Sequence, residues 1–383
     1  MVGPTGPRVG TSEPRVGTSE EARRLLEGSA AIGEAMIGAG CRFFAGYPMT
    51  PFTEVLEHMA RRLPEVGGVC MNAESELEAV GMAWGAAATG TPAATGSTGQ
   101  GLSLMQESLA EITLARLPLV VLNMARAQGD YWQATRGGGH GDYRHIVLAP
   151  VDVAEAVELT YLAFGLAAEW RNPVLLFGDY YLAHTARSVV TPRIDRSTSP
   201  APDWALTGSS GGTGAAKLLS FLGSAKQRDD VGYDLSVHYA ACAEHTARML
   251  ECVTPIVDTG FTEDAEVVVI AFGTPGAYVR AAVRSLREHG VAAGWVRPVT
   301  LVPFPARQIA EAVGNARVVA VYENNTGQMV DDVRLAVLGS VRVEFIGGLS
   351  LDSSGFGIAP DLDVDVIRRR ILSVADISME LQS

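Results

Sequence analysis

Glu74-Ser-Glu-Leu-Glu78 separates a strand-like segment, Gly68-Val-Cys-Met71, from an alanine-rich helix. A glycine-rich turn, Thr95-Gly-Ser-Thr-Gly-Gln-Gly101, follows one short strand later. A carboxylate at the mouth of an apolar element costs desolvation energy unless a partner accepts its charge or its hydrogen bond. Acidic residues in a first helical turn also complement the helix dipole, by roughly a few tenths of a kcal/mol. The run therefore permits either a binding role or a helix-start role.

Helix-period and strand-period segments alternate along most of the chain. Nearly continuous apolar strands between helices indicate an α/β fold whose parallel sheet is covered on both faces. In the first half we expect strands at 42–46, 92–95, 117–123, 145–148 and 173–177, and helices at 29–37, 102–114 and 153–169. Thr50-Pro51 is expected to start another helix, with Thr as N-cap and Pro at the first helical position. A second α/β unit begins at Ala265.

Four parts are expected in the chain. Residues 1–22 contain a tandem repeat of Pro-Arg-Val-Gly-Thr-Ser-Glu and are predicted to form a disordered arm. Residues 23–190 form the first α/β domain, and residues 261–383 form the second. Residues 191–260 are predicted to be a linker or insertion with a connecting helix, because proline, serine, glycine and mixed charges dominate their first part.

Composition limits the possible partners. The formal net charge of −13 argues against binding to nucleic acid or to an anionic membrane surface. The four cysteines form no Cys-x-x-Cys pair, which excludes ferredoxin-type cluster spacings and zinc ribbons within this chain. No signal peptide or spanning helix is visible, so we expect a cytoplasmic protein.

Several separated segments resemble the α subunit of the 2-oxoacid:ferredoxin oxidoreductases, and most of all the 2-oxoisovalerate (branched-chain) type. They lie in order between Ser29 and Ile371 and include Gly46-Tyr-Pro-Met-Thr-Pro51, Leu63-Pro-Glu-Val-Gly-Gly68, Ala73-Glu-Ser-Glu76, Ser103-Leu-Met-Gln-Glu107, Gly137-Gly-Gly-His-Gly-Asp-Tyr-Arg144, Thr300-Leu-Val-Pro-Phe-Pro305 and Gly327-Gln-Met-Val-Asp-Asp-Val-Arg334. The resemblance implies a thiamine-diphosphate-binding-like doubly wound parallel sheet, the pyrimidine domain, at 23–190. It implies a transketolase C-terminal-like α/β domain at 261–383.

The same resemblance implies the site residues. Glu76, with Glu74 as the less favoured register, would lie against the aminopyrimidine and stabilise its protonated ring nitrogen. Thr50 would contact the bound 2-oxoacid, and Arg126 would bind its carboxylate bidentately. The resemblance adds a substrate-binding role for His140, and cofactor contacts from Tyr47, Pro48, Ser97, Thr98 and Gly99.

Plainer roles are open to several of these residues. Thr50 is already explained as an N-cap, Arg126 could pair with Asp130 or Asp142, and His140 could have a purely positional role in its glycine-rich turn. Two further motifs have dual interpretations. Gly273-Thr-Pro-Gly276 could hold an anion or be a plain turn, and Glu323-Asn-Asn-Thr-Gly-Gln328 suits a coenzyme or subunit contact or a capped turn.

The chain offers only half of a thiamine diphosphate site. Thiamine enzymes bind the diphosphate through a metal held by a Gly-Asp-Gly motif, whereas here Gly129-Asp, Gly141-Asp and Gly178-Asp are each followed by Tyr. We therefore expect a β subunit that carries the diphosphate and magnesium, with the cofactor at the interface. The resemblance also implies iron–sulfur clusters on partner chains, γ or ferredoxin-like subunits, α–α contacts in a hetero-oligomer, and coenzyme A as acyl acceptor.

One departure from the family leaves the activity open. The connection after Arg126 is about ten residues shorter than in relatives, and such loops carry specificity. Two alternatives are therefore kept: a subunit of a non-redox thiamine-dependent 2-oxoacid decarboxylase or ligase, and a non-catalytic interface subunit. A partner chain with Cys-x-x-Cys motifs would favour the oxidoreductase over the non-redox enzyme.

Overall fold

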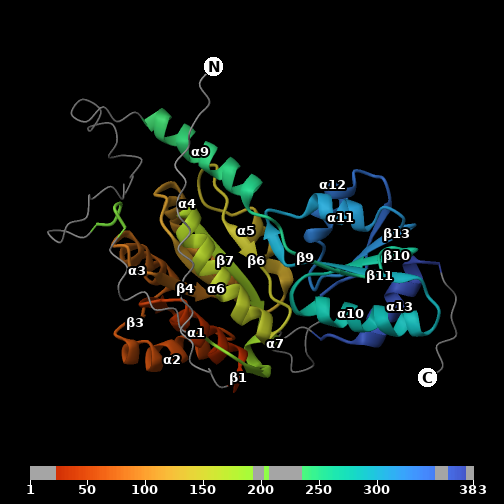
Figure 1. Cartoon of the computed structure of the whole chain (residues 1–383), viewed down its shortest axis with the longest axis horizontal. Coiled ribbons are helices and arrows are strands. Elements are labelled where there is room, and N and C mark those ends of the chain that lie inside the picture. The colour runs from red at the N-terminus through yellow and green to blue at the C-terminus, as the bar shows by residue number, and fades with distance from the viewer. Residues whose placement is uncertain (1–22, 193–201, 207–234, 350–360, 377–383) are drawn as a thin grey trace.

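The computed structural model describes residues 23–192, 202–206, 235–349 and 361–376. Two α/β domains lie side by side, the N-terminal one red to green and the C-terminal one cyan to blue (Figure 1). The predicted arm at 1–22 and most of the first part of the predicted insertion lie outside the described residues. Among the described residues, no helix combines the length and the apolar character needed to cross a membrane.

The N-terminal domain is built on a seven-stranded sheet in the order β12-β6-β7-β5-β4-β2-β3. Its parallel strands are β2 (Phe43–Gly46), β3 (Val69–Asn72), β4 (Ala93–Ser97), β5 (Leu119–Ala125), β6 (Ile146–Leu148) and β7 (Pro173–Asp179). The parallel sheet expected from the apolar strands is therefore confirmed. β12 (Thr300–Val302) comes from far along the chain and adds to the sheet antiparallel to β6.

Helices cover both faces of this sheet, as the apolar strands require. One core holds side chains of α1 (Gly28–Gly38), α2 (Thr53–Arg62) and α6 (Val153–Trp170). The other holds side chains of α3 (Glu76–Ala88) and α4 (Gly99–Leu114), and it continues into the C-terminal domain. The site-bearing helices α3 and α4 thus lie on the face that the second domain also adjoins.

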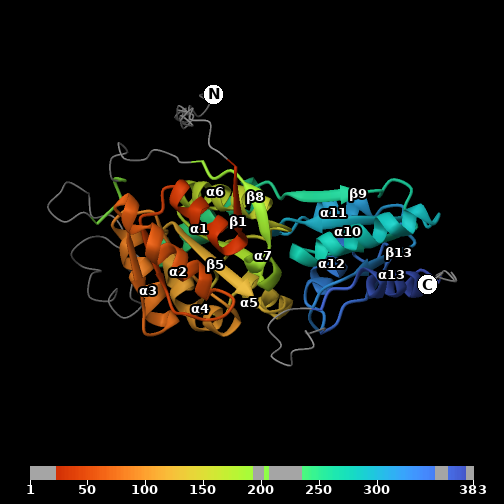
Figure 2. The same ribbon diagram turned by 90° about the horizontal axis from the view of Figure 1, so that it is seen from below.

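The C-terminal domain has a five-stranded sheet in the order β14-β13-β10-β11-β9. Its strands are β9 (Val257–Gly260), β10 (Val267–Ile270), β11 (Ala293–Pro298), β13 (Val318–Val321) and β14 (Arg342–Phe345). Its helices are α10 (Gly273–Glu288), α11 (Ala306–Ala312), α12 (Met329–Val337) and α13 (Val364–Val374). β9 pairs antiparallel with β11 and lies along the edge of this domain in the view from below (Figure 2).

Several further elements lie outside the two larger sheets. β1 (Arg24–Glu27) and β8 (Ala186–Val189) form a separate antiparallel pair. Two short helices, α5 (Tyr131–Thr135) and α7 (Tyr180–His184), follow sheet strands. α9 (Leu235–Cys252), expected as the connecting helix, crosses the N-terminal domain diagonally in Figure 1.

The predicted N-cap role of Thr50 is wrong. Helix α2 begins at Thr53, and Phe52 occupies the N-cap position. The preceding residues form a turn that is closed by a 2.7 Å hydrogen bond from the Phe52 amide to the Met49 carbonyl. Burial of the Phe52 ring beside Phe44, with the ring centroids 6.0 Å apart, explains why the chain turns there before the helix starts.

Buried polar contacts join the two domains. The amide of Gln128 donates to the Asn324 carbonyl at 3.1 Å, and its side-chain oxygen accepts from the Asn324 amide at 2.8 Å. The same side chain donates to the Phe272 carbonyl at 2.9 Å. On another part of the junction, Arg297 binds Glu155 bidentately, with both distances 2.8 Å. Because these groups would be costly to bury unpaired, they specify how the domains fit together.

Candidate functional site

The site lies where β2, β4 and β5 end. These neighbouring strands run parallel and in register, with Gly46 opposite Gly96 and Ser97 opposite Asn123. Their carboxyl ends therefore meet at one edge of the sheet, where the segments that follow them can converge. The segment after β2 carries Thr50, helix α3 begins with Glu76 after β3, and α4 and Arg126 follow β4 and β5.

Glu76 is the buried acid of the site. It is the first residue of α3 and only 2% exposed, whereas Glu74 is exposed. The hydroxyl of Ser97 donates a 2.8 Å hydrogen bond to Oε1 of Glu76. A Cβ atom at Gly101 would lie 2.3 Å from this oxygen and 2.0 Å from the Ser97 hydroxyl, so only glycine fits there. The glycine-rich turn thus makes room for the carboxylate.

The carboxylate of Glu76 has no cationic partner among the described residues. Its single hydrogen bond to Ser97 comes from a neutral hydroxyl. Burying an unpaired carboxylate is expensive, and a positively charged group brought in from outside would relieve that cost. A protonated ring nitrogen is such a group, so the residues present fit the aminopyrimidine of thiamine diphosphate.

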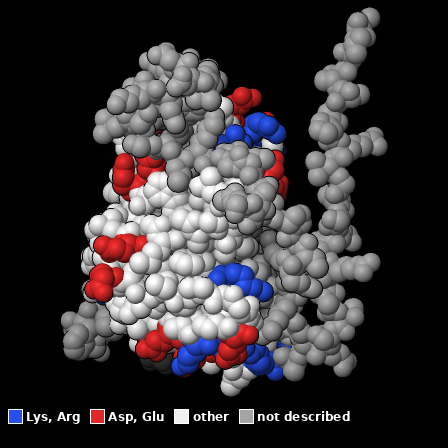
Figure 3. Space-filling view, turned by 90° about the vertical axis from the view of Figure 1, so that its left-hand side faces the viewer, with Lys and Arg blue, Asp and Glu red and all other residues white. Residues whose placement is uncertain are grey.

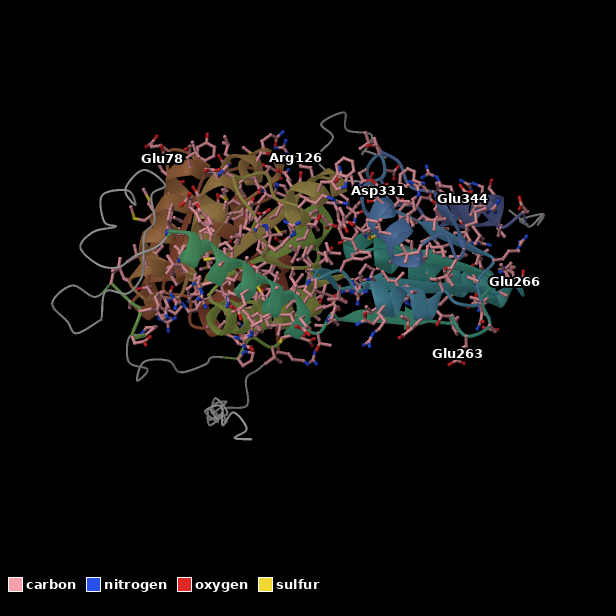
Figure 4. The ribbon with its side chains drawn as sticks, turned by 90° about the horizontal axis from the view of Figure 1, so that it is seen from above. Glu78, Arg126, Glu263, Glu266, Asp331 and Glu344 are labelled. Atoms are coloured by element: carbon pink, nitrogen blue, oxygen red, sulfur yellow. The ribbon has the colours of Figure 1, made fainter. Side chains whose placement is uncertain are left out.

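Arg126 and Thr50 are neighbours at this edge. Nε of Arg126 donates to the backbone oxygen of Thr50 at 3.2 Å. Within the described part of the chain Arg126 makes no ion pair, so the pairing with Asp130 or Asp142 considered from the sequence is not formed. Arg126 lies on the same side of the molecule as Glu78 of α3 and Asp331 of α12 (Figure 4). The outer amino groups of its guanidinium are thus available to an anion.

A hollow of about 290 Å³ lies between Arg126 and the start of α4. Three small residues, Gly99, Ala127 and Gly129, contribute to its wall. The remaining lining residues are polar or charged: Thr98, Gln100, Ser103, Arg126, Asp130 and Gln133. The candidate site therefore contains a polar cavity beside the guanidinium.

The carboxylate of Asp130 occupies the N-terminus of α4. It accepts hydrogen bonds from the side chains of Asn123 at 3.0 Å and Gln133 at 3.1 Å, and from the backbone of Gly99. Burial raises the pKa of Asp130 above its usual value. Because this helix end already holds an acidic group, a phosphate of the cofactor would meet repulsion there.

Two buried atoms near the hollow lack a hydrogen-bond partner among the described residues. They are the hydroxyl of Thr98 and the side-chain oxygen of Asn123, both in residues that are fully buried. Buried polar atoms in folded proteins nearly always have partners. Thr98, predicted to contact the cofactor, thus keeps unused hydrogen-bonding capacity at the site.

The other predicted site residues lie nearby or apart. Tyr47 and Pro48 are in the segment after β2, half-buried and exposed respectively. His140 is exposed, and its backbone amide donates to Glu107 of α4 at 2.8 Å. The structure does not bring His140 into the lining of the hollow.

Tyr143 explains the position of the glycine-rich turn that carries His140. Its hydroxyl accepts hydrogen bonds from the amides of Gly138 at 3.0 Å and Gly139 at 2.9 Å, and donates to Gln106 at 3.1 Å. The turn is thereby attached to the side of α4.

The other Gly-Asp pairs have different surroundings. Asp142 is exposed, whereas Asp179 is buried and accepts from the Leu182 amide and the Thr274 hydroxyl, each at 2.9 Å. Burial raises the pKa of Asp179. Thr274 belongs to the Gly273–Gly276 turn, for which an anion site and a plain turn were both open, and the start of α10 receives a carboxylate of the chain itself. Among the described residues, no group of three or more His, Cys, Asp or Glu could hold a metal ion.

The side chain of Glu323 likewise accepts backbone hydrogen bonds at the start of a helix, α12. Its buried carboxylate accepts from the amides of Gln328, Met329 and Val330 at 2.8–2.9 Å. The 323–328 motif is therefore a capped turn, and through Asn324 it also contacts the segment after β5. The sequence identified the motif but not this contact, because Gln128 lies far away along the chain.

Comparisons with known proteins agree with this geometry. Residues 34–205 match the family model "Pyruvate flavodoxin/ferredoxin oxidoreductase, thiamine diP-bdg". Residues 265–353 match the model "Pyruvate:ferredoxin oxidoreductase core domain II". The first matched region contains strands β2 to β7 of the seven-stranded sheet, and the second contains β12 and strands β10, β11, β13 and β14 of the five-stranded sheet.

Curated relatives extend over most of the chain. It is 36% identical over 326 residues to the ketoisovalerate oxidoreductase subunit VorB of Methanothermobacter thermautotrophicus, covering 82% of this chain and 90% of that protein. It is 35% identical over 349 residues to the 2-oxoglutarate synthase subunit KorA of the same organism, covering 84% and 93%.

Solved structures share the fold. A 2-oxoglutarate:ferredoxin oxidoreductase from Magnetococcus marinus aligns with a TM-score of 0.73 at 23% identity, over 93% of this chain and 66% of that chain. A split-gene transketolase aligns with a TM-score of 0.57 at 14% identity, over 92% and 99%. The fold class predicted from the sequence is confirmed.

Proposed function

This chain belongs to the 2-oxoacid:ferredoxin oxidoreductase family as one of its subunits, and we propose that it is the α subunit of a heteromer that oxidatively decarboxylates a 2-oxoacid to an acyl-coenzyme A. Relatives of similar identity are named for ketoisovalerate and for 2-oxoglutarate. Family membership alone therefore leaves the side chain of the substrate open.

The observation that carries the proposal is the buried carboxylate of Glu76, whose hydrogen-bond partner within the described residues is a neutral hydroxyl. Thiamine diphosphate, when bound, supplies the carbon nucleophile and the electron sink that decarboxylation of a 2-oxoacid requires. Glu76 would hold a proton at the aminopyrimidine ring nitrogen, and Ser97 would keep Oε1 in place so that Oε2 faces the ring.

Arg126 and Thr50 would orient the substrate. The guanidinium of Arg126 is held from one side by the Thr50 carbonyl, which leaves its outer amino groups for the substrate carboxylate. The hydroxyl of Thr50 would donate to the 2-oxo oxygen of the substrate. Prior orientation of both groups lowers the entropic cost of reaching the reactive geometry.

A partner subunit is proposed to cover the end of the N-terminal domain that carries α3 and β3. Exposed apolar side chains gather on these elements: Val69 (50% exposed), Met71 (40%), Leu77 (52%) and Met82 (37%). The described surface in Figure 3, which faces the viewer from this end, is largely uncharged. This exposed apolar surface begins beside Glu76 and suits contact with a β subunit that brings the diphosphate and magnesium.

Electrons and the acyl group would leave through other components. Iron–sulfur clusters on partner chains would take the electrons singly and pass them to ferredoxin or a ferredoxin-like subunit. Coenzyme A would accept the acyl group. These assignments, the cytoplasmic location and the division of the chain at residues 22, 190 and 260 belong to the same proposal.

The test is to co-express the chain with its neighbouring gene products, purify the complex and add thiamine diphosphate, magnesium, coenzyme A and a panel of 2-oxoacids. Reduction of a viologen dye that depends on both coenzyme A and a 2-oxoacid is the expected result. Carbon dioxide release without dye reduction would identify a non-redox enzyme instead. A chain that purifies alone and turns over substrate would contradict the shared site.

A further inference from the structure

The hollow beside Arg126 has an unusually polar lining for a site that would accept an aliphatic side chain. The side chains that line it are Thr98, Gln100, Ser103, Arg126, Asp130 and Gln133, and the other contributors are glycine or alanine. Small-molecule pockets are generally lined by apolar and aromatic residues with a few polar groups. Here polar and charged residues outnumber the others, and Ala127 supplies the largest entirely apolar side chain of the lining.

Three of these polar groups, Ser103, Gln133 and Asp130, are oriented by one another. The Ser103 hydroxyl donates to the side-chain oxygen of Gln133 at 2.6 Å, and the amide nitrogen of Gln133 donates to Asp130 at 3.1 Å and to the Gly99 carbonyl at 3.3 Å. Gln100 is exposed and makes no hydrogen bond through its side chain within the described structure. Ser103, Gln133 and Asp130 thus form a connected set, and Gln100 retains its hydrogen-bonding capacity.

Two side chains of opposite charge, Arg126 and Asp130, line the hollow. Arg126 provides the positive charge that matches the carboxylate common to all 2-oxoacids. Asp130 provides a negative group, held at the start of α4 by Asn123 and Gln133. A second carboxylate on the substrate would meet Asp130 at short range and be repelled. A branched aliphatic side chain would instead displace water from these polar groups without replacing its hydrogen bonds.

We propose that the hollow selects a 2-oxoacid whose side chain carries a neutral hydrogen-bonding group, such as a hydroxyl or an amide, over both branched aliphatic and dicarboxylic 2-oxoacids. The substrate carboxylate lies on Arg126, and the neutral polar group contacts Gln100, Ser103 or Asp130. This specificity rests on the proposed function, and it departs from the branched-chain substrate that the sequence resemblance implies.

The test compares substrates that differ by one group, using the purified complex and dye reduction. 4-Hydroxy-2-oxobutanoate and 2-oxopentanoate differ only by a hydroxyl in place of a methyl. We expect kcat/KM to favour the hydroxyl compound by about tenfold or more, because a site built to bind a hydroxyl rejects an analogue without it. 2-Oxoisovalerate and 2-oxoglutarate should both fall below it.

Variants identify the group responsible. Asp130→Asn keeps the size of the side chain but removes the charge, so the discrimination against 2-oxoglutarate should shrink by about tenfold. Asp142→Asn, in an exposed residue outside the hollow, is the matched control and should leave the substrate ranking unchanged. Circular dichroism and thermal unfolding would verify that both variants fold.

The outcomes separate the two proposals. Preference for 2-oxoisovalerate or 2-oxopentanoate would overturn the specificity and leave the oxidoreductase function standing. An unchanged preference in the Asp130 variant would also overturn it. A complex that reduces dye with none of the 2-oxoacids would overturn the proposed function itself, and the specificity with it.

Discussion

Nε of Arg126 lies 3.2 Å from the backbone oxygen of Thr50, and this hydrogen bond joins residues that are 76 positions apart in the chain. Thr50 follows β2 and Arg126 follows β5, with β4 between these two strands in the sheet. The contact orients the guanidinium while leaving its outer amino groups unpaired within the described residues. Thr50 and Arg126, which were predicted separately as site residues, are therefore in direct contact.

Arg126→Lys should raise KM for the 2-oxoacid and lower kcat/KM by about tenfold to a hundredfold. Lysine keeps the charge but cannot bind a carboxylate bidentately while it also donates to the Thr50 carbonyl. Steady-state kinetics of the complex would measure this, with Arg144→Lys, in an exposed arginine outside the hollow, as control. Equal KM values for Arg126→Lys and the wild type would exclude carboxylate binding by Arg126.

Glu76→Gln should lower kcat by about a hundredfold or more, since general acid–base groups contribute about that much. The substitution keeps the side chain's volume and its hydrogen bond from Ser97, so the fold should persist. Glu74→Gln, two positions earlier and exposed, is the matched control and should retain full activity. Turnover by Glu76→Gln at the wild-type rate would leave this subunit without a catalytic role.

Glu34→Gln should destabilise the N-terminal domain at neutral pH. The carboxylate of Glu34 accepts from His58 at 3.0 Å, Arg62 at 2.7 Å and Arg24 at 2.9 Å. We expect a loss of about 2 kcal/mol, below the full cost of breaking a buried pair, because the two arginines still reach solvent. Thermal and denaturant unfolding would measure it, with Glu57→Gln in an exposed residue of α2 as control.

The effect of Glu34 should depend on pH. Its hydrogen bond from His58, above all, holds the pKa of Glu34 well below the usual 4.5. A depressed folded-state pKa gives stability that is present above the unfolded pKa and is lost as the pH falls through the folded one. The difference between wild type and Glu34→Gln should therefore be largest above pH 4.5 and shrink in acid. A difference that grows in acid would contradict the assignment.

Asp179→Asn should show the opposite dependence. Burial raises the pKa of Asp179 above its usual 3.8, so the folded protein binds this proton more tightly than the unfolded chain does. That stabilisation is complete below the unfolded pKa and is lost as the pH rises through the folded one. The variant should gain stability relative to wild type as the pH rises above 3.8, as denaturant unfolding at a series of pH values would show. Asp142→Asn controls for the loss of a carboxylate.

Local patterns were sufficient to predict the parallel sheets and the main helices. Apolar strands such as β5 and β7 and the alanine-rich α3 have periods that do not depend on distant partners. The same patterns missed β12, because its pairing with β6 joins segments from different domains. They also misplaced the start of α2, where packing of the Phe52 ring outweighed the Thr-Pro signal.

The sequence by itself determined the α/β class, the family and the residue types of the site, because periodicity and motifs are local properties of the chain. Only the tertiary structure decided which carboxylates are buried without a cationic partner and which accept backbone hydrogen bonds at the start of a helix. Glu76 faces no cation among the described residues, whereas Asp130, Asp179 and Glu323 each receive amides at a helix start. That difference depends on partners brought together by folding, and desolvation and hydrogen bonding act only at those short distances.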